Sequence, residues 1–523
     1  MYEQLKAVAG FDTAALRWDA EAYPQRLWAA DPTVWSEEPI PELADRLGWL
    51  DLHRTMRPRL DELARLGESL VEDGILDVVV CGMGGSSLAP DVFSRAMGSG
   101  PSYPNVAVLD STHPVAVAST AAATDPDRTA FVISSKSGTT TETMSFFRYW
   151  WDRTGGDGSR FIAVTDPGTP LQALGEERGF RTVVIAPPDV GGRYSALTPF
   201  GLVPAAIMGA DLEALLDRAG SLAEAASGSR AAEDPAIAMG LAWAAHAVNG
   251  HDKLTFRTSP GLESFPAWLE QLVAESLGKS GRGIIPIAGE PPLPNYAYDR
   301  VFVEYVLAGE ELDHLPDDLP AVRFEVPDPP ALAAEMLRAE VATAAAGEVM
   351  DINPFDQPDV ERAKQLARKA MAEGIGSERV APVPVEGETF RVRLERFLAG
   401  IRPGDYAALQ AFLSPDPETE AAAARFRQVV GERHECATTF GYGPRFLHST
   451  GQLHKGGPDT GVFIQVVDGG SDDIAVPETD FTFGRLIAAQ ADGDYAALRE
   501  RERRVLRVDV SDGGMEALVE ALG

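Results

Sequence analysis

The sequence predicts an α/β protein with two doubly wound parallel sheets, a helical N-terminal segment and an α/β extension at the C-terminal end. Short apolar runs alternate with helix-like stretches, a pattern typical of strands that crossover helices bury on both faces. The runs form two series, separated by an Ala-rich helical stretch. The chain has 523 residues, well beyond the ~250 to 300 at which a single core stops growing.

Two segments make up the first half of the predicted fold. Residues 1–75 space Leu and Trp as helices do, with interruptions at prolines, and we expect a helical N-terminal segment there. Residues 76–225 form the first α/β domain, because each apolar run is followed by a helix pattern. Its predicted strands are "LDVVVCG", "NVAVLD", "TAFVISS", "RFIAVTD" and "RTVVIAP".

The second half repeats this alternation. Residues 226–380 form a second α/β domain, with predicted strands "KLTFRTS", "GIIPIAG", "DRVFVEYVLAG" and "AVRFEVPD". Residues 381–523 follow a Pro-containing connector, and we expect an α/β block that completes the molecule. The hexapeptide "GDYAAL" occurs at Gly404 and again at Gly493. An aspartate that caps a short Ala-Leu helix would account for both copies.

Composition narrows the classes of partner. The formal net charge is −33 and Lys and Arg form no run, which argues against nucleic acid. Two cysteines, Cys81 and Cys436, imply no disulfide framework and favour a reducing compartment. No apolar stretch has the length of a signal peptide or of the ~20 residues that span a bilayer. We therefore expect a cytoplasmic protein without a membrane partner.

The stretch "FVISSKSGTTTETMSFF" runs from a predicted strand through a polar turn into a predicted helix. Unpaired N–H groups at a helix start carry partial positive charge, and small hydroxyl residues let an anion approach them. Lys136 adds a full charge. A turn that merely caps its helix is the alternative. The hydroxyl donors are Ser135, Ser137, Thr139, Thr140 and Thr143.

A second turn of this kind lies in "VVVCGMGGSSLAPDVF". Its glycines permit close backbone approach, and Ser86 stands at the helix start. Both turns follow strands of one parallel sheet, so we expect them to face one crevice and to bind phosphate. A dinucleotide site is the alternative, because Asp110 ends the next strand. The third glycine of that fingerprint is replaced by Ser87.

Two later stretches, "DVGGRYSALTPFGL" and "LEQLVAESLGKSGRG", complete an ordered set of four motifs. With them the chain resembles the glucose-6-phosphate isomerase (phosphoglucose isomerase) family over roughly residues 78–285. A fifth stretch, "NPFDQPDVERAKQLA", resembles a helix of that family. The stretch "GYGPRFLHSTGQLHKGGPDTGVFIQV" is similar to the tail of the isomerase half of bifunctional transaldolase/glucose-6-phosphate isomerase chains.

The resemblance implies two sugar-isomerase (SIS-type) domains that interconvert glucose 6-phosphate and fructose 6-phosphate through a cis-enediolate, a step of glycolysis and gluconeogenesis. It implies no metal, no cofactor and a homodimer. A single positioned carboxylate suffices for this proton shuttle. The substrate-binding residues implied are Gly85, Ser86, Ser135, Lys136, Ser137, Thr139, Thr140, Thr143, Gln271 and Gln357.

The resemblance also assigns the catalytic residues. Glu275 is the base that moves a proton between C1 and C2, and Arg193 lies beside the enediolate, where a guanidinium stabilises developing negative charge. Lys364 and a histidine assist ring opening. The family's histidine precedes the Lys helix, but that interval holds only His314, which does not match. The nearest likeness is "HSTGQLHKGG", which offers His454 and His448, and it favours His454 because this residue follows Gly451-Gln452.

Other interpretations remain open for these residues. Glu275 also fits the solvated face of an amphipathic helix, and Lys364 fits a solvated basic face. A non-catalytic phosphosugar-binding regulator is one alternative function, although such a protein would not need both Glu275 and Arg193. An isomerase with dual glucose 6-phosphate and mannose 6-phosphate specificity is the other.

Overall fold

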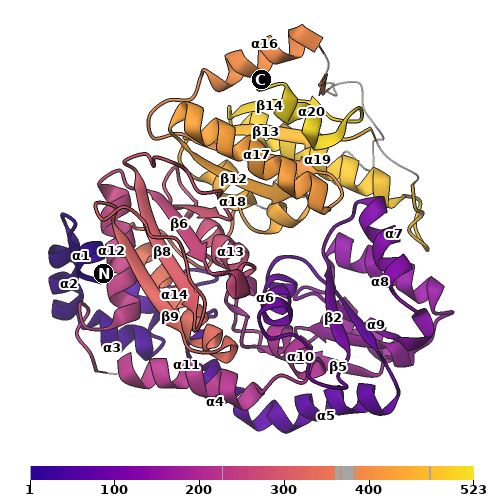
Figure 1. Ribbon diagram of the computed structural model, residues 1–523. Coiled ribbons are helices and arrows are strands. Elements are labelled where there is room, and N and C mark those ends of the chain that lie inside the picture. The colour runs from indigo at the N-terminus through magenta and orange to yellow at the C-terminus, as the bar shows by residue number, and fades with distance from the viewer. Residues whose placement is uncertain (1, 227, 360–364, 367–381, 386, 470–472) are drawn as a thin grey trace.

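The computed structural model describes residues 2–226, 228–359, 365–366, 382–385, 387–469 and 473–523. In these residues three β-sheets, each entirely parallel, form the framework of the molecule (Figure 1). The predicted α/β class is therefore confirmed, with a sheet in the C-terminal block as well. No helix of the described residues is both long and apolar enough to cross a membrane.

The N-terminal segment is helical, as predicted. Its tryptophans Trp18 and Trp49 are buried, so this segment contributes to the main hydrophobic core. The side chain of Trp49 packs against Tyr194, with ring centroids 4.9 Å apart. The helices are α1 (Tyr2–Lys6), α2 (Phe11–Ala20), α3 (Tyr23–Trp28), α4 (Leu52–Thr55) and α5 (Leu60–Glu72).

The first sheet has the strand order β2-β1-β3-β4-β5. Alternate residues of one strand, such as Phe131 and Val132, enter different hydrophobic clusters on the two faces, which explains why its central strands are apolar throughout. Its strands are β1 (Asp77–Cys81), β2 (Asn105–Leu109), β3 (Thr129–Ser134), β4 (Phe161–Thr165) and β5 (Thr182–Ile185). Its helices are α6 (Leu88–Met97), α7 (Pro114–Ala123), α8 (Thr141–Arg153), α9 (Pro170–Glu177) and α10 (Pro199–Ile207).

The second sheet has the order β7-β6-β8-β9. One face packs into the main core, and Ile285 and Ile287 pack on Tyr406 and Phe463 of the C-terminal block. Its strands are β6 (Lys253–Thr258), β7 (Ile285–Ala288), β8 (Arg300–Leu307) and β9 (Ala321–Val326). The helices around it are α11 (Leu212–Ala226), α12 (Pro235–Val248), α13 (Phe265–Leu277) and α14 (Leu332–Val349).

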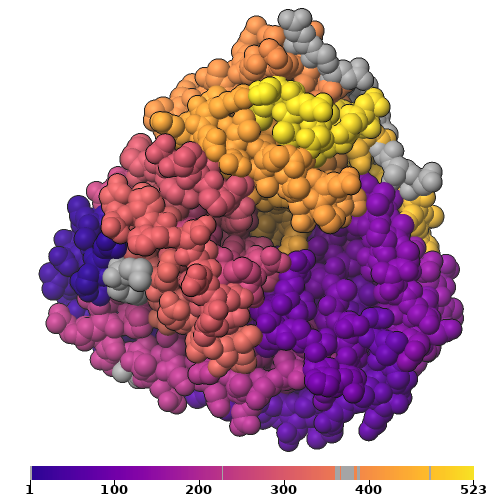
Figure 2. All heavy atoms as spheres, in the orientation of Figure 1, coloured from indigo at the N-terminus to yellow at the C-terminus, as the bar shows by residue number. Residues whose placement is uncertain are grey.

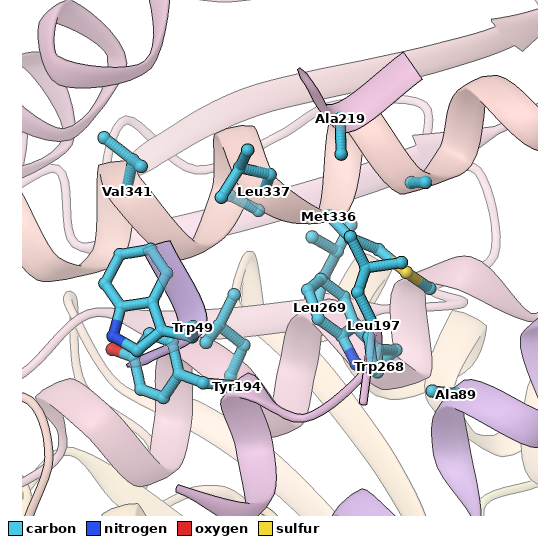
Figure 3. Packing of buried hydrophobic residues seen from close by; sticks show 14 of the residues in the cluster. Trp49, Ala89, Tyr194, Leu197, Ala219, Trp268, Leu269, Met336, Leu337 and Val341 are labelled. Carbon is cyan, nitrogen blue, oxygen red and sulfur yellow. The ribbon is translucent and has the colours of Figure 1, made fainter. Parts of the chain in front are cut away.

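Helix α14 runs through the centre of the main core. Figure 3 shows Met336, Leu337 and Val341 of this helix above Trp268 of α13 and Trp49. Its Ala-rich sequence lets α12 approach closely, since a Cβ at Gly240 would lie 2.1 Å from the Ala342 carbonyl oxygen. This dense packing holds α13 in place, and α13 carries Glu275 and Gln271.

The third sheet, in the C-terminal block, has the order β10-β14-β13-β11-β12. Tyr406–Leu409 of the first "GDYAAL" copy lie in β11, and the second copy lies in the interior of helix α19, whose N-cap is Thr482, so the capped-helix interpretation was wrong for both copies. The strands are β10 (Val383–Pro384), β11 (Tyr406–Phe412), β12 (Ala437–Tyr442), β13 (Gly461–Val467) and β14 (Arg504–Asp509). The helices are α16 (Gly387–Leu398), α17 (Pro417–His434), α18 (Gly451–Gly456), α19 (Phe483–Glu500) and α20 (Gly514–Glu520).

The C-terminal block contacts both of the other sheet-bearing parts. Arg427 of α17 donates hydrogen bonds to the carbonyl oxygens of Ala288 and Gly289, and Arg178, which directly follows α9, forms an ion pair with Glu478 at 3.1 Å. In Figure 2 the surface is hollowed where the C-terminal block meets the two parts that precede it in the chain. The block thus closes one side of the region into which the predicted site residues fall.

Candidate active site

The turn after β1 is packed against the Gly-Gly-Arg turn. Residues Gly84–Ser86 form a short 3-10 helix between β1 and α6, and Gly84 has φ +56°, a conformation that favours glycine. A Cβ at Gly85 would lie 2.0 Å from the Gly192 carbonyl oxygen. A side chain at Gly85 would therefore separate the two turns, which explains the glycine in this motif.

The hydroxyl-rich turn follows β3, which pairs directly with β1, so both turns lie at the same edge of the sheet. The Ser135 hydroxyl accepts a hydrogen bond from the Gly138 N–H at 3.1 Å and lies 3.0 Å from the Thr140 hydroxyl. The Ser137 and Thr139 hydroxyls are also 3.0 Å apart. These contacts preorganise a row of hydroxyl groups at the start of α8.

Lys136, the cation of the hydroxyl-rich turn, is paired with a carboxylate. The Lys136 ammonium forms an ion pair with Asp166, a carboxyl group whose pKa is raised by burial although Lys136 opposes this shift. The Thr143 hydroxyl is fully buried and makes no hydrogen bond within the described residues. Ser86 is buried as well. The two corners together offer hydroxyl groups, backbone N–H groups and one cation to an anion.

Glu275 lies on the buried side of α13, not on a solvated face. Its Oε2 accepts a hydrogen bond from Gln271 Nε2 at 3.2 Å, one helical turn away. Its Oε1 lies 3.6 Å from Arg193 Nη1. The other hydrogen of the Gln271 amide goes to the His448 carbonyl oxygen at 2.8 Å, so the C-terminal block directly touches the residue that holds Glu275.

Arg193 is almost fully buried, with 3 % of its surface exposed, and its guanidinium is fixed on all sides. Nε donates to the Ser276 hydroxyl at 2.7 Å and Nη1 to the Gln357 Oε1 at 3.2 Å. Nη2 donates to the carbonyl oxygens of Pro354 and Asp356 at 2.7 and 3.0 Å. A planar cation held in this way cannot turn away from a neighbouring negative charge.

Lys279 shares the surroundings of Arg193. Its ammonium donates to the carbonyl oxygen of Asn353 at 2.6 Å and to the Asp356 carboxylate at 2.7 Å. Burial, and next the charge of Arg193, lower the pKa of Lys279 to about 8. Lys279, which follows α13, thus ties that helix to the segment that carries Gln357. Gln357 and Glu275 therefore both lie next to Arg193.

The two candidate histidines lie in different environments. His448 Nε2 is 2.9 Å from Oε1 of Glu142, which stands in the first turn of α8. His454 is buried inside the C-terminal block, where Nδ1 lies 3.0 Å from the Gln410 amide. Burial, and next the charge of Lys455, hold the pKa of His454 well below its usual range. The structure therefore places the His448 imidazole against Glu142 and the His448 carbonyl against Gln271, whereas the His454 ring lies among Gln410, Phe446 and Phe463.

The comparisons with known proteins support the family resemblance that the sequence motifs indicated. The family model "Phosphoglucose isomerase" matches residues 54–283. The glucose-6-phosphate isomerase of Rubrobacter xylanophilus is 30% identical over 417 residues, which cover 68% of this chain and 94% of the relative. A glucose-6-phosphate isomerase of Thermus thermophilus is 30% identical over 388 residues, which cover 63% of this chain and 91% of the relative.

The chain belongs to the phosphoglucose isomerase family.

Solved structures show the same fold. A hypothetical protein of Thermus thermophilus matches with a TM-score of 0.57 at 28% identity, covering 69% of this chain and 97% of its own length. A glucose-6-phosphate isomerase of Chlamydia trachomatis matches with a TM-score of 0.53 at 21% identity, covering 71% of this chain and 81% of its own. Both similarities leave part of this chain uncovered.

The family motifs account for most of the residues assembled here, and three of their members were not assigned a role from the sequence. Glu142 contacts His448, Ser276 contacts Arg193, and Lys279 contacts Asp356. All three stand inside quoted motifs, so the signal was present. Gln490 of α19 also donates to Glu142 at 2.6 Å, and no motif marked it. Lys364 lies outside the described residues.

The acidic residue that a dinucleotide site would need, Asp110, is already paired with another side chain. Asp110, which follows β2, forms an ion pair with Arg445 of the C-terminal block at 3.3 Å. A carboxylate used in this way is not available to bind a ribose hydroxyl. Among the described residues no group of three or more His, Cys, Asp or Glu side chains is placed to hold a metal ion.

Proposed function

We propose that this protein is a glucose-6-phosphate isomerase that interconverts glucose 6-phosphate and fructose 6-phosphate. The observation that carries the proposal is Glu275, a carboxylate held between the Gln271 amide and the Arg193 guanidinium. Family membership supports the same conclusion. The unbroken Glu275–Arg193 pair gives no support to a regulator that has lost catalysis.

In the proposed mechanism Glu275 removes the C2 proton of the open-chain sugar. The electron pair of that C–H bond forms the C1–C2 double bond, and the C1 carbonyl oxygen becomes an oxyanion next to Arg193. The proton on O2 moves to O1, and Glu275 returns its proton to C1. The product is fructose 6-phosphate, and no atom or electron is lost.

The other predicted residues take supporting roles in this proposal. The hydroxyl corners around Ser86 and 135–143 hold the phosphate, and Gln357 holds sugar hydroxyls. Ring opening requires a proton for the ring oxygen, and we assign that proton to His448 rather than His454, because His448 has a carboxylate partner in Glu142. Lys364 assists, as the family resemblance implies.

This assignment divides the work among the parts of the chain. Residues 76–225 bind the phosphate, 226–380 carry the base, and 381–523 deliver the histidine from the same chain. We also propose that the protein is cytoplasmic. We further propose that it forms a homodimer, and sedimentation of the purified protein measures this oligomeric state.

The test uses purified protein, fructose 6-phosphate and a coupled assay for glucose 6-phosphate. The wild-type protein is expected to turn over, and Glu275→Gln to lower kcat about 1000-fold, because a general base typically contributes ~10²- to 10⁴-fold. Exchange of the C2 proton with deuterated water, followed by NMR, should fall equally, while phosphosugar binding remains.

The matched control is Glu263→Gln, since Glu263 precedes the same helix and its side chain is 72% exposed. It is expected to keep wild-type kcat. Undiminished proton exchange in Glu275→Gln would remove Glu275 from the role of base.

A further inference from the structure

Arg445 begins the 3-10 turn that ends at His448, and its side chain leaves the C-terminal block. Nη2 donates to Asp91 Oδ2 at 3.1 Å, and Nε lies 3.3 Å from Asp110 Oδ2. One guanidinium therefore bridges two carboxylates of the first α/β part. A 3-10 helix rises about 2 Å per residue, so this anchor lies about 6 Å along the turn from His448.

The two carboxylates belong to the framework of the phosphate corner. Asp91 lies in the first turn of α6, where its N–H donates to the Ser87 carbonyl oxygen at 2.9 Å. Asp110 directly follows β2, the neighbour of β1. The anchor thus joins the histidine turn to the helix that begins just after Ser86, a residue of the proposed phosphate site.

The charges of this cluster depend on one another. Burial would raise the pKa of Asp91, but the charges of Arg445 and Arg95 outweigh it and hold that pKa below its usual value. Burial raises the pKa of Asp110 although Arg445 opposes the shift. Against its own burial, the carboxylates of Asp110 and Asp91 raise the pKa of Arg445. Partly desolvated charges of this kind hold a fixed geometry because none is satisfied alone.

We propose that Arg445 is a positioning residue for the isomerase reaction. By bridging Asp91 and Asp110 it fixes the turn Arg445–His448 and so sets the His448 imidazole against Glu142. This inference rests on the proposed function. It gives Asp110 the role of holding Arg445, which the sequence patterns did not indicate.

The experiment measures kcat and KM for fructose 6-phosphate in Arg445→Met, Arg445→Lys and the paired variant Arg445→Met with Asp110→Asn. Arg445→Met alone would leave the Asp110 carboxylate buried without its ion-pair partner, and the paired variant removes that carboxylate. If Arg445→Met does not fold, the paired variant is used for the test. We expect kcat to fall 10- to 100-fold with KM changed less than about 3-fold, because a small misplacement of a reacting group costs up to ~10² in rate. Arg445→Lys is expected to recover kcat to within about 5-fold of the wild type.

Two further measurements separate positioning from simple docking. Arg178→Met removes another ion pair between the first α/β part and the C-terminal block, and it is expected to keep kcat within about 2-fold. Adding Arg445→Met and Asp110→Asn to His448→Gln is expected to cause no further loss, because effects that pass through one residue are not additive.

Wild-type kcat in the paired variant, an equal loss in Arg178→Met, or multiplicative losses in the His448→Gln background would each overturn the positioning role. A wild-type protein that does not convert fructose 6-phosphate would instead defeat the proposed function.

Discussion

Two neighbouring regions of the C-terminal block, the turn Arg445–His448 and helix α18 (Gly451–Gly456), place their histidines in opposite environments. The turn Arg445–His448 faces the other parts of the molecule, and its histidine meets the Glu142 carboxylate. Helix α18 turns inward, and its His454 packs against Phe446 and Phe463, with ring centroids 5.8 and 5.0 Å away. The likeness in sequence favoured His454, since it follows Gly-Gln, but packing decides which imidazole reaches Glu142.

The difference is physical. A histidine that exchanges protons needs a partner for its charged form and access to the reacting group. His448 has a carboxylate partner and a side chain that is 16% exposed. His454 is 4% exposed, and cations lie nearby, so its charged form is disfavoured. We therefore expect the first region to govern rate and the second to govern stability.

The strongest test of this contrast is His448→Gln. We expect kcat for fructose 6-phosphate to fall about 100-fold or more with KM little changed, because a positioned acid or base typically contributes ~10²- to 10⁴-fold. Steady-state kinetics measure it. His314→Gln is the control, since His314 is 83% exposed and should keep wild-type rates. A His448→Gln protein with wild-type kcat would break the contrast.

His454→Gln is expected to show the reverse. The amide can still contact Gln410, so kcat should stay within about 2-fold, while the free energy of unfolding at pH 7 falls by about 1 to 2 kcal/mol. Urea unfolding and steady-state kinetics on the same protein measure both quantities. A large loss of kcat in a folded His454→Gln protein would return His454 to the catalytic candidates.

The dependence of stability on pH sharpens this second prediction. The pKa of His454 lies well below the 6.5 of an unperturbed histidine, so below pH 6.5 the unfolded state binds the extra proton and stability falls as the pH falls. The loss reaches up to about 1.4 kcal/mol per pH unit. His53, His246 and His434 also have lowered pKa values, so His454→Gln should make this slope shallower between pH 6.5 and 5 without abolishing it, whereas His314→Gln should retain the wild-type slope. Equal slopes in the two variants would contradict a buried, neutral His454.

The smallest expected effect concerns Gln490, which lies on the face of α19 that meets Glu142. Its amide donates to Glu142 at 2.6 Å and accepts from the Thr112 hydroxyl at 2.9 Å. Gln490→Met keeps the volume and removes both contacts, and we expect kcat to fall about 3- to 10-fold because the Glu142–His448 pair is less well held. Gln428→Met, at an exposed pair with Glu432, is the control. Equal kcat in both variants would show that Gln490 does not help to position the Glu142–His448 pair.

Much of the candidate site could be predicted because its requirements are local. A glycine is favoured at Gly84 because this turn residue takes a φ of +56°. Hydroxyls gather at 135–143 because a strand-to-helix turn presents N–H groups to an anion. Gln271 and Glu275 meet because they are one helical turn apart. Arg445 and Gln490 were not recognised, since their partners are more than 300 residues away in sequence.

The sequence by itself determined the order of strands and helices, since apolar runs and turn residues are short-range signals, and its motifs determined the family. Only the tertiary structure decided which conformation each copy of a repeated segment adopts and which of two candidate histidines reaches the site. "GDYAAL" forms a strand at β11, where β12 and β13 pair with it on both sides, and a helix within α19. Likewise His448 and not His454 meets Glu142. In each case the deciding contacts come from residues distant in the chain, and such contacts exist only once the sheets have packed together.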